Sequence, residues 1–243
     1  MVEVHYSPFL IAASVLVAIM AAFTSLRLTS GLSAQPIVRR KMRIAQASVA
    51  LGGGIWSMHF IGMLAFDMGM PVSYDVPITA LSMILAWAVC AVAFFVVSRG
   101  ATSFGRIALS GVLMGGGVAI MHYTGMSAMR MPARMSFDTT LVVVSVVIAI
   151  VASSVALWLA FNIKKTWQMA AASVVMGVAV TGMHYTGMLA ARFTMIESQT
   201  PAQVSAISSQ FLAYTVFLLS LVILTLAIAF GRVDEGYDDL VTE

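Results

Sequence analysis

The chain has 243 residues, of which 60% are hydrophobic and only 9% are charged, and its formal net charge is +3. Soluble domains carry about 25% charged residues, so this composition excludes a soluble globular protein and predicts a multi-pass protein in a lipid bilayer. The basic residues form no cluster with interleaved aromatic residues, so we expect no nucleic-acid partner.

Seven long segments without a charged residue follow one another along the chain. Each offers about 20 residues, enough to cross a hydrocarbon layer of about 30 Å as a helix. A helix is required there because backbone polar groups find no water partners in lipid. The seven segments are Tyr6–Leu26, Ile44–Phe66, Val76–Ser98, Ile107–Met129, Thr139–Ile163, Thr166–Ala191 and Pro201–Gly231.

The last segment is longer than one span requires, so we expect its helix over about Gln210–Gly231. The predicted fold class is therefore an all-α membrane protein with seven transmembrane helices. An alternative has six spans, with the first segment only peripheral to the membrane.

Lysine and arginine divide unequally between the two sides of these spans. Ten lie in the connections that follow the odd-numbered spans, and three lie in the connections that follow the even-numbered spans. Basic residues collect on the cytoplasmic side, so we expect an external amino terminus and a cytoplasmic carboxyl terminus. The ten are Arg27, Arg39, Arg40, Lys41, Arg43, Arg99, Arg106, Lys164, Lys165 and Arg232, and the three are Arg130, Arg134 and Arg192.

A histidine motif recurs three times at a nearly constant period. His59, His122 and His184 are 63 and 62 residues apart, and each lies seven residues before the end of its apolar segment. They are therefore about 10 Å inside the outer ends of spans two, four and six. This pattern predicts a two-helix repeat that occurs three times, and ionisable residues at such depth are candidates for a functional site. The copies are Met58-His59-Phe60-Ile61, Met121-His122-Tyr123-Thr124 and Met183-His184-Tyr185-Thr186.

Each motif histidine has one methionine directly before it and another four residues after it. The later methionine shares the helix face of the histidine. Imidazole combined with soft thioether sulfur favours Cu(I), and such pairs without a carboxylate do not resemble a hydrolytic zinc site. We therefore predict a copper site with ligands drawn from His59, His122, His184, Met58, Met63, Met121, Met126, Met183 and Met188.

Further residues of the motifs are expected to support these ligands. Hydroxyl groups beside the second and third histidines are suited to orienting the imidazoles. A glycine three residues after each histidine lets another helix approach closely. The hydroxyl residues are Tyr123, Thr124, Tyr185 and Thr186, and the glycines are Gly62, Gly125 and Gly187. The structural alternative is that the methionines only fill space and that each histidine bonds a neighbouring carbonyl.

The motif Met-His-Tyr-Thr at 121–124 and 183–186 resembles the signature of the MHYT-domain membrane sensors of bacteria, while 58–61 departs from it in lacking both hydroxyls. The resemblance covers roughly His5 to Arg232. It implies a seven-span sensory domain over residues 1–232 in the bacterial cytoplasmic (inner) membrane, followed at 233–243 by an acidic tail or the start of a linker. It also implies copper bound by the motif residues, and O2, CO or NO as the signal.

We therefore expect a sensor rather than an enzyme. Its expected partners are the lipid bilayer, copper or a diatomic gas, and a cytoplasmic output module, such as a cyclic di-GMP enzyme, that is fused or separate; a homodimer is left open. One alternative is a transporter or channel for copper or protons, although the helices offer few polar groups on the cytoplasmic side of the motifs. Another is a haem-binding redox protein with paired histidines.

Overall fold

The computed structural model describes residues 5–32, 35–99, 103–163, 165–195, 206–223 and 225. Within these residues, six helices are long and apolar enough to cross a membrane, and a shorter apolar helix covers Ser209–Ile223. The first predicted span is one of the six, which argues against a peripheral role for it. Apart from Thr225, the seventh predicted span beyond Ile223 lies outside the described residues. The six are α1 (Pro8–Thr29), α2 (Ile37–Leu64), α3 (Val76–Val97), α4 (Phe104–Ser127), α5 (Thr139–Asn162) and α6 (Thr166–Ala190).

Helices α1, α3 and α5 begin at equivalent points of the three repeats. Their N-caps are Ser7, Asp75 and Asp138, and each cap side chain accepts a hydrogen bond from a backbone N–H of the first turn. These bonds pair amide groups that have no partner within the helix. A polar cap therefore fixes where each odd-numbered helix starts.

Helix α2 begins earlier than the hydrophobic segment predicted. It starts at Ile37, so the basic residues at 39–41 and 43 lie in its first turns, before the apolar run that begins at Ile44. Hydropathy marks the part of a helix that lies in lipid, but it does not mark turns that continue beyond the membrane.

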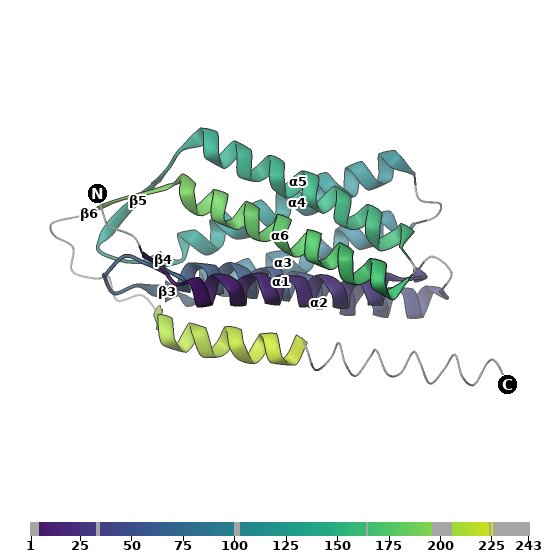
Figure 1. Cartoon of the computed structure of the whole chain (residues 1–243), viewed down its shortest axis with the longest axis horizontal. Coiled ribbons are helices and arrows are strands. Elements are labelled where there is room, and N and C mark those ends of the chain that lie inside the picture. Colours follow the sequence, from purple (N-terminus) through teal and green to yellow (C-terminus); the bar gives the residue numbers. More distant parts are fainter. Residues whose placement is uncertain are drawn as a thin grey trace.

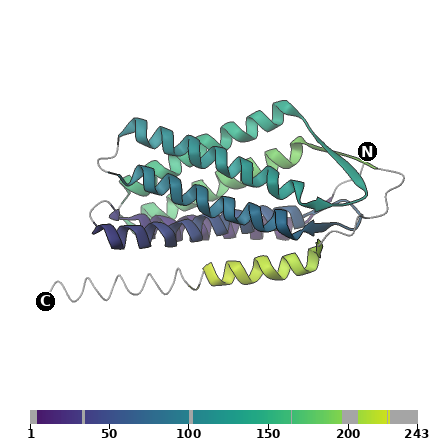
Figure 2. The ribbon, with the colours of Figure 1, turned by 180° about the vertical axis from the view of Figure 1, so that it is seen from behind.

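The even-numbered helices form the centre of the bundle. Helix α1 contacts α2 and α6, α3 contacts α2 and α4, α5 contacts α4 and α6, and the three even-numbered helices also contact one another. The three repeats therefore close into a ring. The helix Ser209–Ile223, yellow in Figures 1 and 2, lies along one side of this bundle.

Glycines on the central helices set how closely the outer helices approach. A Cβ atom added to Gly54, Gly115 or Gly177 would fall less than 3.0 Å from atoms of α1 or α5. The backbones could not come so close if these positions carried side chains, and small residues allow such packing between membrane helices.

Among the described residues, seven short strands lie at the end of the bundle that carries the motifs (Figure 1), and the all-α prediction did not anticipate them. In every repeat, the strand before the odd-numbered helix pairs with the strand after the even-numbered helix. Strands of two to five residues are too short to show a hydrophobic alternation. The pairs are β1 (His5–Tyr6) with β2 (Phe66–Asp67), β3 (Ser73–Asp75) with β4 (Met129–Arg130) and β7 (Ala206–Ser208), and β5 (Ala133–Phe137) with β6 (Ala191–Met195).

Candidate metal centre

The imidazoles of His59, His122 and His184 meet at the centre of the bundle. Their Nδ1 atoms form a triangle with edges of 3.0 Å between His59 and His122, 3.1 Å between His59 and His184, and 3.3 Å between His122 and His184. All three side chains are buried. In the part of the chain that the structure describes, this is the one group of three or more His, Cys, Asp or Glu side chains that could share a metal ion.

Hydrogen bonds alone cannot satisfy all three Nδ1 atoms of this triangle. A neutral imidazole carries one N–H, so each Nδ1 is either a donor or an acceptor. Three mutually adjacent atoms always include two with the same role, and such a pair cannot form a hydrogen bond. The three Nε2 atoms also have no hydrogen-bond partner among the described residues. Neutral rings without an ion would therefore leave at least one close contact between like groups.

A cation resolves the conflict, because all three Nδ1 lone pairs can then point at it. Three nitrogens at about 2.0 Å from one tetrahedral ion lie about 3.3 Å from one another. The observed edges of 3.0–3.3 Å are close to that value. The three histidines therefore fit a single small metal ion that prefers imidazole nitrogen.

The six predicted methionine ligands are all buried, with 0–2% of their surface exposed. Three of them lie one helical turn after a motif histidine and three lie directly before one. They add buried, apolar and polarisable side chains to the helices that carry the histidines. Their role as metal ligands remains a prediction. The six are Met58, Met63, Met121, Met126, Met183 and Met188.

An aromatic ring follows each histidine and stands edge-on to the imidazole. The ring centroids of His59 and Phe60, His122 and Tyr123, and His184 and Tyr185 are each 4.8 Å apart. The two tyrosine hydroxyls bond serines on outer helices, at 2.7 Å for Tyr123 with Ser145 and 3.3 Å for Tyr185 with Ser14. The tyrosines thus touch the imidazoles through their rings, and their hydroxyls reach outward.

Three serines on the outer helices were missed in the sequence analysis. Ser14, Ser82 and Ser145 are fully buried, and each donates a hydrogen bond to the carbonyl three residues earlier. Each therefore accepts from a central helix, and in the first repeat the donor is the Trp56 indole, 3.0 Å from Ser82 Oγ. All three lie seven residues after the N-cap of their helix, a repeat spacing that could have revealed them.

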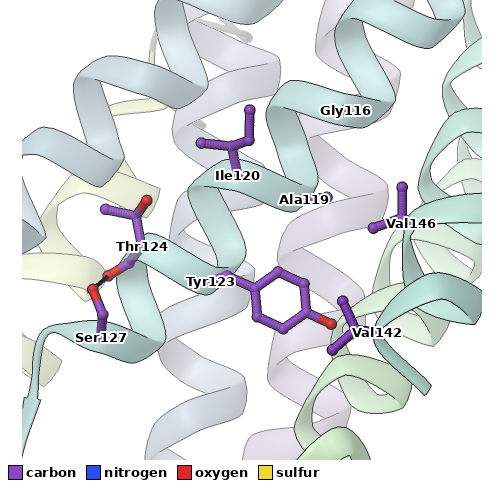
Figure 3. Close-up of a pocket in the computed structure, with 8 residues that line it drawn as sticks. All are labelled: Gly116, Ala119, Ile120, Tyr123, Thr124, Ser127, Val142 and Val146. Carbon is purple, nitrogen blue, oxygen red and sulfur yellow. Dashed lines mark hydrogen bonds between the residues drawn. The ribbon is translucent and has the colours of Figure 1, made fainter. Parts of the chain in front are cut away.

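The two predicted threonines are only half-buried, unlike the imidazoles. The hydroxyl of Thr186 donates to the Gly182 carbonyl of its own helix at 2.7 Å. Thr124 and Tyr123 both line a groove of about 530 Å³ between α4 and α5, and Figure 3 shows the Tyr123 ring pointing toward Val142. The groove is lined by Gly116, Ala119, Ile120, Tyr123, Thr124, Ser127, Val142 and Val146.

Aromatic residues of the strands cover the rings beside the histidines. Tyr74 contacts Phe60, Phe137 contacts Tyr123, and Tyr6 contacts Tyr185, with ring centroids 5.3–6.1 Å apart. Each of these three residues directly precedes an N-cap. Burial raises the pKa of the Tyr74 phenol, and burial together with the neighbouring Tyr185 raises the pKa of Tyr6. Both phenols are therefore neutral at physiological pH, and the aromatic side chains that cover the rings carry no charge.

The short strands at the motif end of the bundle form what we call the strand layer. In the second and third repeats, ion pairs connect residues in or next to the strands of this layer. Arg130 lies 2.9 Å from Asp75, and Arg192 lies 2.7 Å from Asp138. Both arginines come eight residues after their motif histidine, where the first repeat has Asp67. The Asp67 carboxylate instead accepts a hydrogen bond from the Gly69 amide at 2.9 Å.

A threefold helical bundle, with one buried histidine from each repeat at its axis, defines a class of membrane-embedded repeat proteins. The family model described as MHYT, a bacterial signalling protein N-terminal repeat, matches residues 52–110, 115–173 and 177–238. The chain belongs to the MHYT family, as the resemblance of its motifs predicted.

Curated relatives of this chain are signalling proteins. The chain is 37% identical over 235 residues to the bifunctional diguanylate cyclase/cyclic di-GMP phosphodiesterase MucR of Pseudomonas aeruginosa, covering 95% of this chain and 34% of that protein. It is 36% identical over 199 residues to the signaling protein YkoW of Bacillus subtilis, covering 79% of this chain and 25% of that protein. It is also 33% identical over 207 residues to the cyclic di-GMP phosphodiesterase NbdA of P. aeruginosa, covering 83% and 26%.

The chain thus spans about a third or less of the length of these relatives. No solved structure matches it.

Proposed function

We propose that this chain is a membrane sensor in which His59, His122 and His184 hold one copper ion through their Nδ1 atoms. Buried methionines beside them complete the ligand set. The signal is binding of a diatomic gas (O2, CO or NO) to the metal, or occupancy by the metal itself. The output is a change in cyclic di-GMP turnover by a cytoplasmic module, as the names of MucR and NbdA suggest.

The observation that supports this proposal most is the triangle of Nδ1 atoms, which protons cannot satisfy and a cation can. Thioethers of the buried methionines that flank these histidines in the sequence would favour a soft ion such as Cu(I) over zinc. A haem between these histidines is disfavoured, because a porphyrin has to lie between its axial ligands and nitrogens 3.0–3.3 Å apart leave no gap for it.

The sidedness that the basic residues predict puts the strand layer outside the cytoplasmic membrane and the carboxyl terminus inside. In that orientation, copper or a gas reaches the site from the external half of the bilayer. Any shift of α2, α4 or α6 is passed to the outer helices through the bonds at Ser14, Ser82 and Ser145. A coupling free energy of about 1–3 kcal/mol is enough for such a switch.

The test is Cu(I) binding by the purified protein in detergent, measured by competition with a chromophoric chelator and by elemental analysis. We expect one tightly bound copper ion in the wild type, and its loss in His122→Ala and His184→Ala. His5→Ala, outside the cluster, is the matched control and should bind like wild type. Unchanged copper content in the two cluster variants would show that the copper is not bound by these histidines.

Two further measurements on the same preparations separate the alternatives. A Soret band in the absorption spectrum would indicate haem, and uptake of copper into liposomes would indicate transport. For the output, the matching 235 residues of MucR are replaced by this chain, and cyclic di-GMP is measured with and without copper. A response that disappears in the His122→Ala chimaera supports the sensor proposal, while a response that persists contradicts it.

A further inference from the structure

The side of each imidazole that faces away from the Nδ1 triangle is pressed against a glycine of a neighbouring helix. A Cβ atom added to Gly125 would collide with Nε2 of His59, one added to Gly187 with Nε2 of His122, and one added to Gly62 with Nε2 of His184. In all three cases Nε2 is the nearest atom, at well under 3.0 Å, followed by Cδ2 of the same ring. Each ring edge therefore occupies the volume that a side chain would take.

These contacts run in one direction around the bundle. We call each of these glycines the seat of the imidazole that it contacts. Gly125 of α4 is the seat of His59 of α2, Gly187 of α6 is the seat of His122 of α4, and Gly62 of α2 is the seat of His184 of α6. Every motif places one imidazole at the centre of the bundle, and the glycine of the same motif contacts the imidazole of another helix. All three helices must be in register for any one ring to be held correctly.

We propose that Gly62, Gly125 and Gly187 are positioning residues that fix Nδ1, rather than Nε2, as the atom each histidine presents to the metal. This inference rests on the proposed function and names how its site is assembled. The glycine seats occupy the Nε2 edge of each ring, so a ring can reach the centre only with its other edge. Simple helix packing would not require the glycine to face an imidazole in all three repeats.

The chain supplies matched controls on the same helices. Gly116 on α4 and Gly182 on α6 have no atom within 4 Å of an added Cβ. Alanine at these positions changes helix propensity as alanine at Gly125 and Gly187 does, but it meets no ring. Any difference between Gly125→Ala and Gly116→Ala, or between Gly187→Ala and Gly182→Ala, therefore reports the seat alone.

The first experiment measures Cu(I) affinity. We expect Gly125→Ala and Gly187→Ala to bind Cu(I) about 10–100-fold more weakly than wild type, the range seen when a group that orients a metal ligand is lost. Gly116→Ala and Gly182→Ala should bind like wild type. Equal affinity in the seat variants and their controls would overturn the proposal. If wild type itself binds no Cu(I), the proposed function fails instead, so the two failures are distinguishable.

The second experiment uses ¹⁵N NMR of histidine-labelled protein loaded with Cu(I), because the chain has only four histidines. We expect the coordination shift on Nδ1 of three rings and none on the fourth. A shift on Nε2 of the cluster histidines would overturn the proposal.

A third measurement covers the case in which a seat variant folds poorly. Gly125→Ala should lower the apparent Tm of the apoprotein, and it should do so much less in a His59→Ala background, where the colliding ring is absent. In a His184→Ala background the loss should persist, since Gly125 does not seat that ring. The same loss in both backgrounds would contradict the assigned pairing.

Discussion

The first repeat and the other two build the same site with different supporting groups. Repeats two and three place a tyrosine after the histidine and donate its hydroxyl to a serine, whereas the first repeat has Phe60 there and donates from Trp56. Repeats two and three close their strand layer with an arginine–aspartate pair, while the equivalent position of the first repeat is Asp67.

The histidine and its glycine seat are common to all three repeats. The comparison therefore separates two layers of the molecule. The central layer consists of the three histidines and their glycine seats, and the supporting layer consists of the aromatic, serine and ion-paired residues around them. The central layer requires the same geometry three times, because the three Nδ1 atoms lie within 3.0–3.3 Å of one another. The supporting layer requires only that each outer-helix serine receives a donor and that each ring is covered, and different side chains meet that requirement. Variants that act on the two layers should differ in kind.

The largest effect is expected in the central layer, where the three repeats should be equivalent. His59→Ala, His122→Ala and His184→Ala should each weaken Cu(I) binding by at least about 100-fold, the upper end of what loss of a merely supporting group costs. The three Nδ1 atoms are nearly equidistant, so no one histidine should dominate. Chelator competition on the three variants measures this. If His59→Ala retained wild-type affinity, the first repeat, which has Phe60 and Trp56 as its supporting residues, would not contribute to the metal site.

Loading with the metal provides the complementary measurement. Cu(I) at about 100 times its Kd should stabilise the folded wild type by about 2.7 kcal/mol. None of the three histidine variants should show this rise in Tm at the same concentration. An equal rise in His122→Ala would mean that copper stabilises the protein from another site.

The sequence predicted the central layer better than the supporting layer. Apolar length and the absence of charge identify α1 to α6, and the equal depth of the three histidines predicts that they can meet. The order of the helices around the bundle and the choice of Nδ1 depend on contacts between helices that a single sequence does not encode as a pattern. The link from α6 back to α1, through Tyr185 and Ser14, joins residues 171 positions apart.

The supporting layer contains the features that sequence analysis missed, and the reasons are physical. Strands of two to five residues show no alternation, and a lone serine in an apolar helix has many roles. Ser14, Ser82 and Ser145 become recognisable only when the three repeats are aligned on their N-caps. The tyrosine hydroxyls were expected near the imidazoles, but they bond serines because the rings already fill the space beside the histidines.

The next largest effect concerns the two ion pairs. Arg130→Met removes the charged partner of Asp75, whose side chain is only 7% exposed and keeps its hydrogen bond from the Ile78 amide, so we expect a loss of about 2 kcal/mol. Arg192→Met leaves Asp138, which is 28% exposed, and should cost less than about 1 kcal/mol. Thermal unfolding in detergent compares the two. Equal losses would mean that burial of the carboxylate does not set the strength of these pairs.

A smaller effect, a coupling of about 1 kcal/mol, should follow from exchanging the two kinds of donor. Trp56→Phe removes the indole that bonds Ser82, and Phe60→Tyr adds a hydroxyl at a fully buried position, so each single change should cost about 1–3 kcal/mol. In the double variant the new hydroxyl can replace the lost indole N–H. We expect the double loss to be about 1 kcal/mol smaller than the two single losses together. Strict additivity in thermal unfolding would show that the first repeat does not accept the tyrosine arrangement.

The smallest effect is expected from the tyrosine hydroxyls themselves. Tyr123→Phe should cost about 1 kcal/mol, and Tyr185→Phe should cost less, because the bond to Ser145 is 2.7 Å and the bond to Ser14 is 3.3 Å. Both serines keep their bonds to backbone carbonyls, so neither is left without a partner. Cu(I) affinity should change less than threefold, since the rings still contact the imidazoles edge-on. A tenfold loss of affinity in either variant would mean that the hydroxyls belong to the central layer, and the separation between the two layers would then be wrong.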